Sequence, residues 1–132
     1  MMGSGSVTIA ERKAALGRAP AYLYRFDWET PVFNGKYISP HGLEMPMVFD
    51  NVEGGGLIWA DGTAEAKKMA VKMSESWIAF AATGNPNTRE SGLPQWPAYD
   101  SKKRAMMIFD NESWIAYDPL KLRRVIFSRN QK

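Results

Sequence analysis

The hydrophobic and polar positions of the chain form one strong helical pattern in the middle of the sequence. Apolar residues recur there at spacings of three and four, and lysines and glutamates occupy the opposite side. Thr63 can cap the start of this helix, while Gly84 and Pro86 end it. The pattern predicts a long helix that turns one side to a core, with the apolar stripe Ala66, Met69, Ala70, Met73, Trp77, Phe80 and Ala81.

Two shorter segments have the character of β-strands. Residues 21–28 alternate, with one face aromatic and the other carrying Leu23, Arg25 and Asp27. Residues 104–109 form a second, largely apolar run. We therefore expect two strands, of which the first is not buried equally on its two sides. The aromatic face of this first strand consists of Tyr22, Tyr24, Phe26 and Trp28.

The remaining segments give weaker local signals. Thr8 and Glu11 have the spacing of a capping box, and Gly17 and Pro20 end a helix, so a short helix is expected over residues 8–16. Residues 29–37 are typical of a turn and loop, residues 54–56 of a flexible glycine break, and residues 85–103 of a surface connection. The apolar positions near the C-terminus fit a last helix or strand.

The order strand, helix, strand indicates an α/β fold, because a right-handed crossover helix normally joins parallel strands. Two or three strands are too few to cover an amphipathic helix and five tryptophans, so we expect one part of a larger sheet. We divide the chain into a flexible leader or expression remnant at residues 1–6, an α/β part at residues 7–118 and a basic tail at residues 119–132.

Composition excludes several kinds of chemistry. The 132 residues contain no cysteine and one histidine, which excludes disulfides and thiolate catalysis and argues against a metal site. We expect no cofactor. No apolar run approaches the roughly 18 to 20 residues that span a bilayer, and the start lacks the regions of a signal peptide. The expected location is the cytoplasm, without a membrane partner.

The net charge of +3 does not indicate a nucleic-acid partner once its origin is located. Five of the 17 basic residues lie in residues 121–132, where there is no acid, and the rest of the chain carries −2. A short basic terminus of this kind is usually solvated. We therefore expect no nucleic-acid binding.

The only histidine of the chain, His41, lies between Pro40 and Gly42. Proline disfavours helix in the residue before it, and glycine permits unusual backbone angles after it. His41 is therefore expected on an irregular loop, where an acid/base group is commonly placed.

Four segments resemble, in the same order, the C-terminal portion of the type-B carboxylesterases, the cholinesterase-like branch of the α/β-hydrolase superfamily. They are residues 19–26, 40–49, 73–87 and 93–100, within a similarity that covers residues 7–118. The second segment fits the family pattern His-Gly-x-Glu-x-Pro-x-Val-Phe. The resemblance implies that His41 is the catalytic histidine and that Glu44 supports the site through hydrogen bonds.

In these hydrolases the nucleophilic serine stands in Gly-x-Ser-x-Gly, and serine and acid precede the histidine along the chain. No serine of this sequence has that context, and the glycine-rich oxyanion loop is also absent. We therefore expect a carboxylesterase fragment that is inactive alone and acts on a small ester only with a complementing esterase chain. The alternative is a non-catalytic domain from a truncated gene that self-associates.

Overall fold

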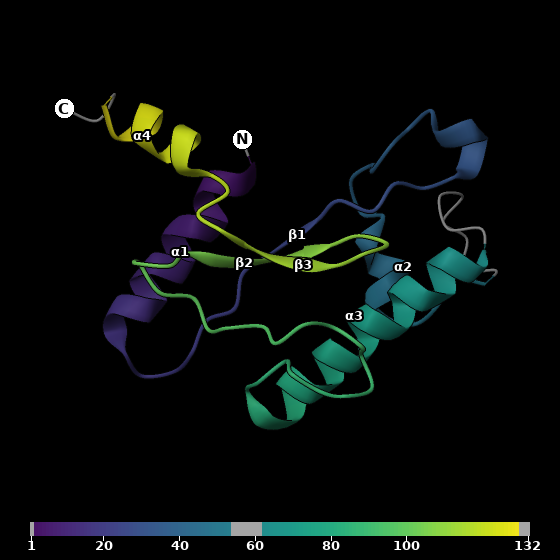
Figure 1. Cartoon of the computed structure of the whole chain (residues 1–132), viewed down its shortest axis with the longest axis horizontal. Helices are drawn as coiled ribbons and strands as arrows, with labels where there is room; N and C mark the ends of the chain where they lie inside the picture. The colour runs from purple at the N-terminus through teal and green to yellow at the C-terminus, as the bar shows by residue number, and fades with distance from the viewer. Residues whose placement is uncertain (1, 54–61, 130–132) are drawn as a thin grey trace.

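The computed structural model describes residues 2–53 and 62–129, in which a three-stranded sheet lies between helices (Figure 1). The glycine run predicted to be flexible, residues 54–56, lies outside the described residues. The elements are, in order, α1 (Met2–Leu16), β1 (Tyr24–Phe26), the 3₁₀ helix η1 (Val32–Gly35), α2 (Glu44–Val48), α3 (Ala64–Thr83), β2 (Ala105–Phe109), β3 (Trp114–Tyr117) and α4 (Lys121–Arg129).

The sheet has the order β1-β2-β3, with β2 in the centre. β1 and β2 run parallel, with Tyr24 opposite Met107, and α3 lies in the connection between them. β2 and β3 run antiparallel, with Met107 opposite Ile115. The predicted α/β arrangement with parallel strands is confirmed, whereas β3 was not predicted.

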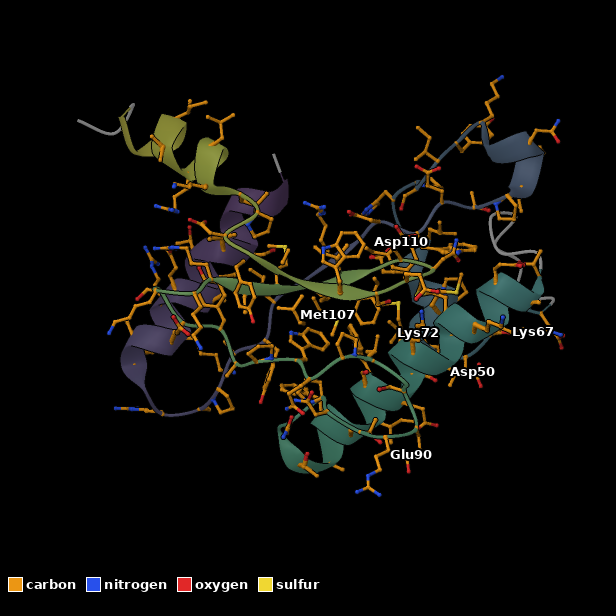
Figure 2. All side chains as sticks on the ribbon, viewed as in Figure 1. Asp50, Lys67, Lys72, Glu90, Met107 and Asp110 are labelled. Atoms are coloured by element: carbon orange, nitrogen blue, oxygen red, sulfur yellow. The ribbon has the colours of Figure 1, made fainter. Side chains whose placement is uncertain are left out.

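Each face of the sheet is covered by a different helix. Met107 and Phe109 of β2 point to the face covered by α2 and α3, and we call the cluster there the α3-side core (Figure 2). Met106 and Ile108 point to the face covered by α1, in the α1-side core. All five residues of β2 are buried, because a central strand between two helical layers has no solvated face.

The alternation predicted for residues 21–28 is confirmed, although only its centre is paired as a regular strand. The four aromatic residues all join the α3-side core, and Leu23 joins the α1-side core. Beyond β1 the backbone is held by individual hydrogen bonds. The N–H groups of Asp27 and Trp28 both donate to the Phe109 carbonyl, at 2.9 and 3.0 Å.

The predicted ends of α3 are confirmed. The Thr63 hydroxyl accepts a hydrogen bond from the Ala66 N–H at 3.2 Å, which satisfies one free amide of the first turn. Gly84 ends the helix with φ +75°, and its N–H donates to the Phe80 carbonyl at 2.7 Å. Lys72, halfway along α3, donates to the carbonyls of Asp110 (3.3 Å) and Asn111 (2.5 Å) and ties the helix to the β2–β3 turn (Figure 2).

Helix α1 starts earlier than its capping signal predicted. It begins at Met2, so residues 2–6 of the predicted flexible leader are helical. The reason is that each further residue adds one hydrogen bond once a helix is nucleated, which offsets the cost of about 1 kcal/mol for a glycine in a helix. The predicted stop is correct: α1 ends at Leu16, and Gly17 follows with φ +63°.

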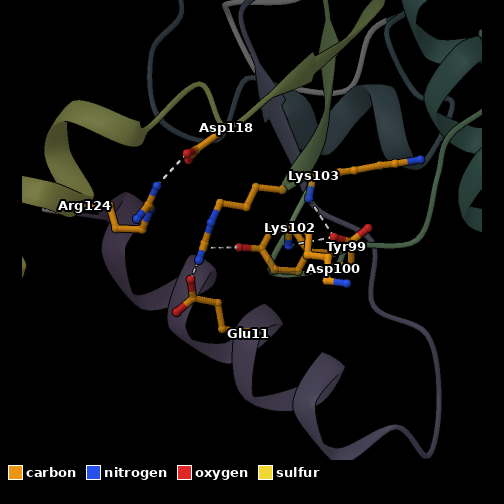
Figure 3. A network of polar contacts seen from close by, with 8 residues as sticks. Glu11, Tyr99, Asp100, Lys102, Lys103, Asp118 and Arg124 are labelled. Carbon is orange, nitrogen blue, oxygen red and sulfur yellow. Dashed lines mark hydrogen bonds and ion pairs between the residues drawn. The ribbon is translucent and has the colours of Figure 1, made fainter.

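A polar network attaches α1 to the start of β2 (Figure 3). Arg104 forms an ion pair with Glu11 of α1 and donates to the Tyr99 hydroxyl at 3.1 Å. The Glu11 carboxylate and the Tyr99 hydroxyl hold the guanidinium in place, and the hydrogen bond to Glu11 raises the pKa of Arg104 above its usual value. This network fixes α1 across the α1-side core.

The predicted basic tail begins as a folded part of the molecule. Leu120 packs against the α1-side core, and the tail then forms α4. Arg124 of α4 pairs with Asp118 at 2.5 Å (Figure 3).

Among the described residues there is no helix both long and apolar enough to cross a bilayer.

Candidate functional site

The loop that carries His41 leaves the sheet at the carboxyl end of β1 and returns to the same place. Thr30 is buried, and its N–H donates to the Ile38 carbonyl at 2.9 Å, which closes the base of the loop. Within it, Phe33 and Asn34 have positive φ values of 55° and 58°, which turn the chain back. The loop therefore closes on itself just beyond the carboxyl end of β1, and His41 follows three residues after this closure.

His41 itself lies in a turn that leads directly into α2. The Leu43 N–H donates to the Pro40 carbonyl at 3.1 Å, and Gly42 has φ +83°, a conformation that favours glycine. Leu43 and Met47 are fully buried in the α3-side core, whereas the His41 side chain is exposed. The prediction of an irregular loop position for His41 is confirmed.

The segment after the histidine differs from its expected form. No helix was predicted there, and the structure has the helix α2, Glu44–Val48. Pro46 is tolerated because it lies in the first turn, where backbone N–H groups have no partner within the helix. The short helix fixes Glu44 one turn beyond His41.

His41 and Glu44 line one hollow of 790 Å³ along the outer edge of β1. Residues of the loop and of β1 share this lining, among them Ser39, Tyr24 and Arg25. Burial raises the pKa of the Tyr24 phenol, and the nearby negative charge of Glu44 raises it further. Tyr24 and Arg25 were not predicted as part of the site, because the hollow that they line together with His41 depends on the return of the loop and leaves no local signal.

The described residues do not complete a catalytic set around His41. Within residues 2–53 and 62–129, neither the His41 nor the Glu44 side chain has a hydrogen-bond partner. Ser76 of α3 also lines the hollow, but its hydroxyl donates to the Lys72 carbonyl at 2.8 Å. In the same part of the chain, no three carboxylate or imidazole groups gather to hold a metal ion. The imidazole is therefore accessible, and among the described residues no serine or carboxylate is hydrogen-bonded to it.

The charges around the hollow are partly compensated. Arg25 pairs with Asp27, two residues further along the strand, through bonds of 2.6 and 2.5 Å. This hydrogen bonding raises the pKa of Arg25 above its usual value. Most other lining residues are apolar, including Trp77, Phe80 and Pro86.

Comparison with known proteins places this arrangement in a family. The model of the carboxylesterase family matches residues 1–127. The chain belongs to the carboxylesterase family. Its α/β fold is that of one part of an α/β-hydrolase, as the resemblance of the four segments implied.

The individual relatives agree with this assignment. The para-nitrobenzyl esterase of Bacillus subtilis is 38% identical over 114 residues, which are 84% of this chain and 22% of that protein. The human cocaine esterase is 35% identical over 95 residues, 69% of this chain and 16% of that protein. The structure of a Geobacillus stearothermophilus carboxylesterase matches with a TM-score of 0.74 at 38% identity, covering 88% of this chain and 23% of that chain.

This carboxylesterase segment therefore spans less than a quarter of the length of these relatives. Family membership and fold are established by the matches. The roles assigned to His41 and Glu44 stay predictions, since they depend on groups beyond the described residues.

Proposed function

We propose that this chain supplies the general base, His41, to a serine-dependent carboxylic ester hydrolase. The observation that carries the proposal is the accessible imidazole at the carboxyl end of β1, in a hollow large enough to admit a further part of an enzyme. Family membership and the match of residues 41–49 to the family pattern support it.

The chemistry requires an imidazole at this position. During acylation, His41 accepts the proton of the serine hydroxyl as the oxygen attacks the ester carbonyl. It then returns that proton to the leaving alcohol, and in deacylation it repeats the transfer with water. A carboxylate must hold the other ring nitrogen to fix the tautomer. In this proposal Glu44 supports the completed site through hydrogen bonds.

We propose that the 132 residues do not hydrolyse esters by themselves. The sequence has no Gly-x-Ser-x-Gly and no glycine-rich oxyanion loop, and Ser76 is committed to a helix carbonyl. A complementing esterase polypeptide provides serine, acid and oxyanion donors in this proposal. The substrate is then a small carboxylic ester.

Complementation tests both statements. The Bacillus subtilis para-nitrobenzyl esterase, truncated to remove the segment that matches this chain, is mixed with this chain and assayed with 4-nitrophenyl acetate. We expect no activity from either part, activity from the mixture, and a loss of at least about a thousandfold in kcat with His41→Ala. Lys36→Ala, an exposed change in the same loop, is the matched control.

Two outcomes contradict the proposal. Hydrolysis by this chain alone that disappears with His41→Ala would show that its catalytic set is complete. Equal activity of the mixtures containing His41→Ala and the unchanged chain would show that His41 is not the base.

A second candidate function is a non-catalytic domain that self-associates. The exposed apolar side chains favour it, because a free monomer would leave them in water. They include Ile9, Phe49, Ile78 and Leu122. Light scattering coupled to gel filtration tests this alternative, and a folded monomer over a wide concentration range excludes it.

A further inference from the structure

The backbone groups of β2 alternate between its two neighbours in the sheet. The Met107 N–H donates to the Leu23 carbonyl at 2.9 Å, and the Phe109 carbonyl accepts from residues that follow β1. Met107 and Phe109 therefore turn their polar groups to β1. In a strand with a neighbour on each side, the residues between these two serve the other neighbour. Met106 and Ile108 thus bond to β3.

The same alternation leaves two residues of β3 facing outward. Ala116 and Trp114 lie opposite the two residues of β2 that bond to β3, so their backbone groups are used within the sheet. The N–H and C=O groups of Ile115 and Tyr117 point away from β2. β3 is the last strand of the sheet order, and no strand pairs with its outer side in the described part of the chain. β3 thus presents a free edge.

This edge is accessible and has few of the features that keep strand edges apart. Trp114 lies on the face of the α1-side core and Tyr117 on the opposite face, with exposed fractions of 45% and 60%. Neither helical layer therefore covers the sheet at these positions. Residues 114–117 contain no charge and no proline, and their pairing with β2 has no bulge. The shortness of β3, four residues, makes any pairing weak.

We propose that β3 pairs with β3 of a second copy of this chain, antiparallel about a two-fold axis at Ala116. In this register Ile115 lies opposite Tyr117 of the second copy, and the outward groups of the two residues exchange both hydrogen bonds. Their side chains lie on the same face, and an aromatic residue beside a β-branched one is a favourable cross-strand pair. The two-fold axis forms this contact twice and closes it, so the assembly stops at a dimer.

The charges at the two ends of β3 favour the antiparallel direction. The turn before β3 carries Asp110 and Glu112, and α4 after it begins at Lys121. Lys72 donates to two carbonyls of this turn and compensates one of its two acids. Among the described residues, Glu112 and Lys121 are both exposed and form no ion pair. Antiparallel pairing brings the acidic turn of each copy beside the basic end of the other, whereas parallel pairing places like charges together.

The proposed dimer lies across the sheet from the candidate site. The hollow of His41 runs along the outer edge of β1, and β3 forms the opposite edge. The proposal therefore gives the self-associating alternative a defined interface, and it is equally compatible with complementation of an esterase. It depends only on the free edge of this chain.

Exchanging the charges tests the pairing. Light scattering coupled to gel filtration measures the dimer, whose Kd is expected at tens of micromolar, roughly, for so small a contact. We expect Glu112→Lys and Lys121→Glu each to weaken the dimer about tenfold at low salt, because each places like charges together twice. An equimolar mixture of the two variants should dimerise at least as tightly as the unchanged chain, since both contacts then join opposite charges. Lys36→Glu, an exposed charge change in the His41 loop, is the matched control and should change the Kd less than about twofold.

Three outcomes of this experiment overturn the proposal. A monomer at concentrations up to about 1 mM shows that the edge does not pair. Equal effects of Lys121→Glu and Lys36→Glu place the contact between copies elsewhere and leave self-association itself intact. A mixture of the two exchanged variants that dimerises no more tightly than its components excludes the antiparallel contact.

Amide hydrogen exchange measured by NMR gives a second readout at the edge itself. We expect the amides of Ile115 and Tyr117 to gain protection as the chain is concentrated, whereas the Ala116 amide is already protected in the monomer. Protection gained by Tyr24 in place of these two residues would show pairing at β1 and would also overturn the proposal. None of these measurements uses esterase activity, so their outcome is separate from the role of His41.

Discussion

Phe109 offers a direct test of how the α3-side core holds the site. It is fully buried at the end of β2, and its ring contacts those of Tyr24, Trp77 and Trp96 at centroid distances of 5.7, 6.2 and 5.7 Å. Its carbonyl also accepts the Asp27 and Trp28 amides. Replacing Phe109 by alanine removes the ring but keeps these backbone bonds.

The expected cost depends on the contacts that the ring loses. Deleting a buried phenylalanine side chain typically costs 3 to 5 kcal/mol, because the site collapses only in part. The contact with three other rings argues for the middle or upper part of that range, so we expect about 4 kcal/mol. With a urea m-value of about 1.5 kcal/mol/M, the midpoint of unfolding falls by roughly 2 to 3 M.

Urea unfolding followed by tryptophan fluorescence measures this shift. Phe49→Ala is the matched control, because Phe49 is 76% exposed and its loss should cost less than about 0.5 kcal/mol. If Phe109→Ala does not fold, Phe109→Leu allows the same comparison, with an expected loss of about 1 kcal/mol in the free energy of unfolding. Equal midpoints for the variants at positions 109 and 49 would refute the assignment of Phe109 to the core.

Three further changes test single features. Thr63→Ala should lower the free energy of unfolding by about 1 kcal/mol through loss of the bond to Ala66, and Thr63→Ser should restore most of it; urea unfolding that shows no difference contradicts the cap. Gly84→Ala should lower the free energy of unfolding by about 1 kcal/mol, because φ at this position is +75°. Gly5→Ala within α1 should raise it by about 0.5 to 1 kcal/mol. Thermal unfolding should therefore show a lower melting temperature for the first variant and a higher one for the second. The pKa of Tyr24 is raised, so the stability that its neutral phenol contributes is present below pH of about 10 and lost as the pH rises through the folded-state pKa. Tyr24→Phe should therefore flatten the alkaline fall of the unfolding free energy, and an unchanged fall counts against this cause.

The elements that the sequence predicted well have signals within a few residues. Thr63 and Gly84 lie at the ends of α3 as their side-chain and backbone properties require. The alternation around Tyr24 was correct because side chains along a strand point to opposite faces whether or not every residue is paired. These features depend on local chemistry, and local chemistry is visible in the sequence.

The elements that were missed depend on context. α2 was missed because Pro46 argues against a helix unless its position in the first turn is known. β3 was missed because the turn before it lacks glycine and is built instead on Ser113, whose hydroxyl donates to the Asp110 carbonyl at 2.9 Å. Within the candidate site, the loop position of His41 was predictable from Pro40 and Gly42, whereas the hollow that it shares with Tyr24 depended on the closed loop.

The buried centre of the sheet also affects the tendency of the unfolded chain to aggregate. β2 presents five consecutive uncharged residues, 105–109, and such a run forms intermolecular cross-β contacts when it becomes exposed. Arg104 and Asp110 flank the run with opposite charges, in the position of gatekeepers that oppose stacking of copies. Loss of either charge should therefore speed aggregation from the unfolded chain even where the folded molecule is little changed.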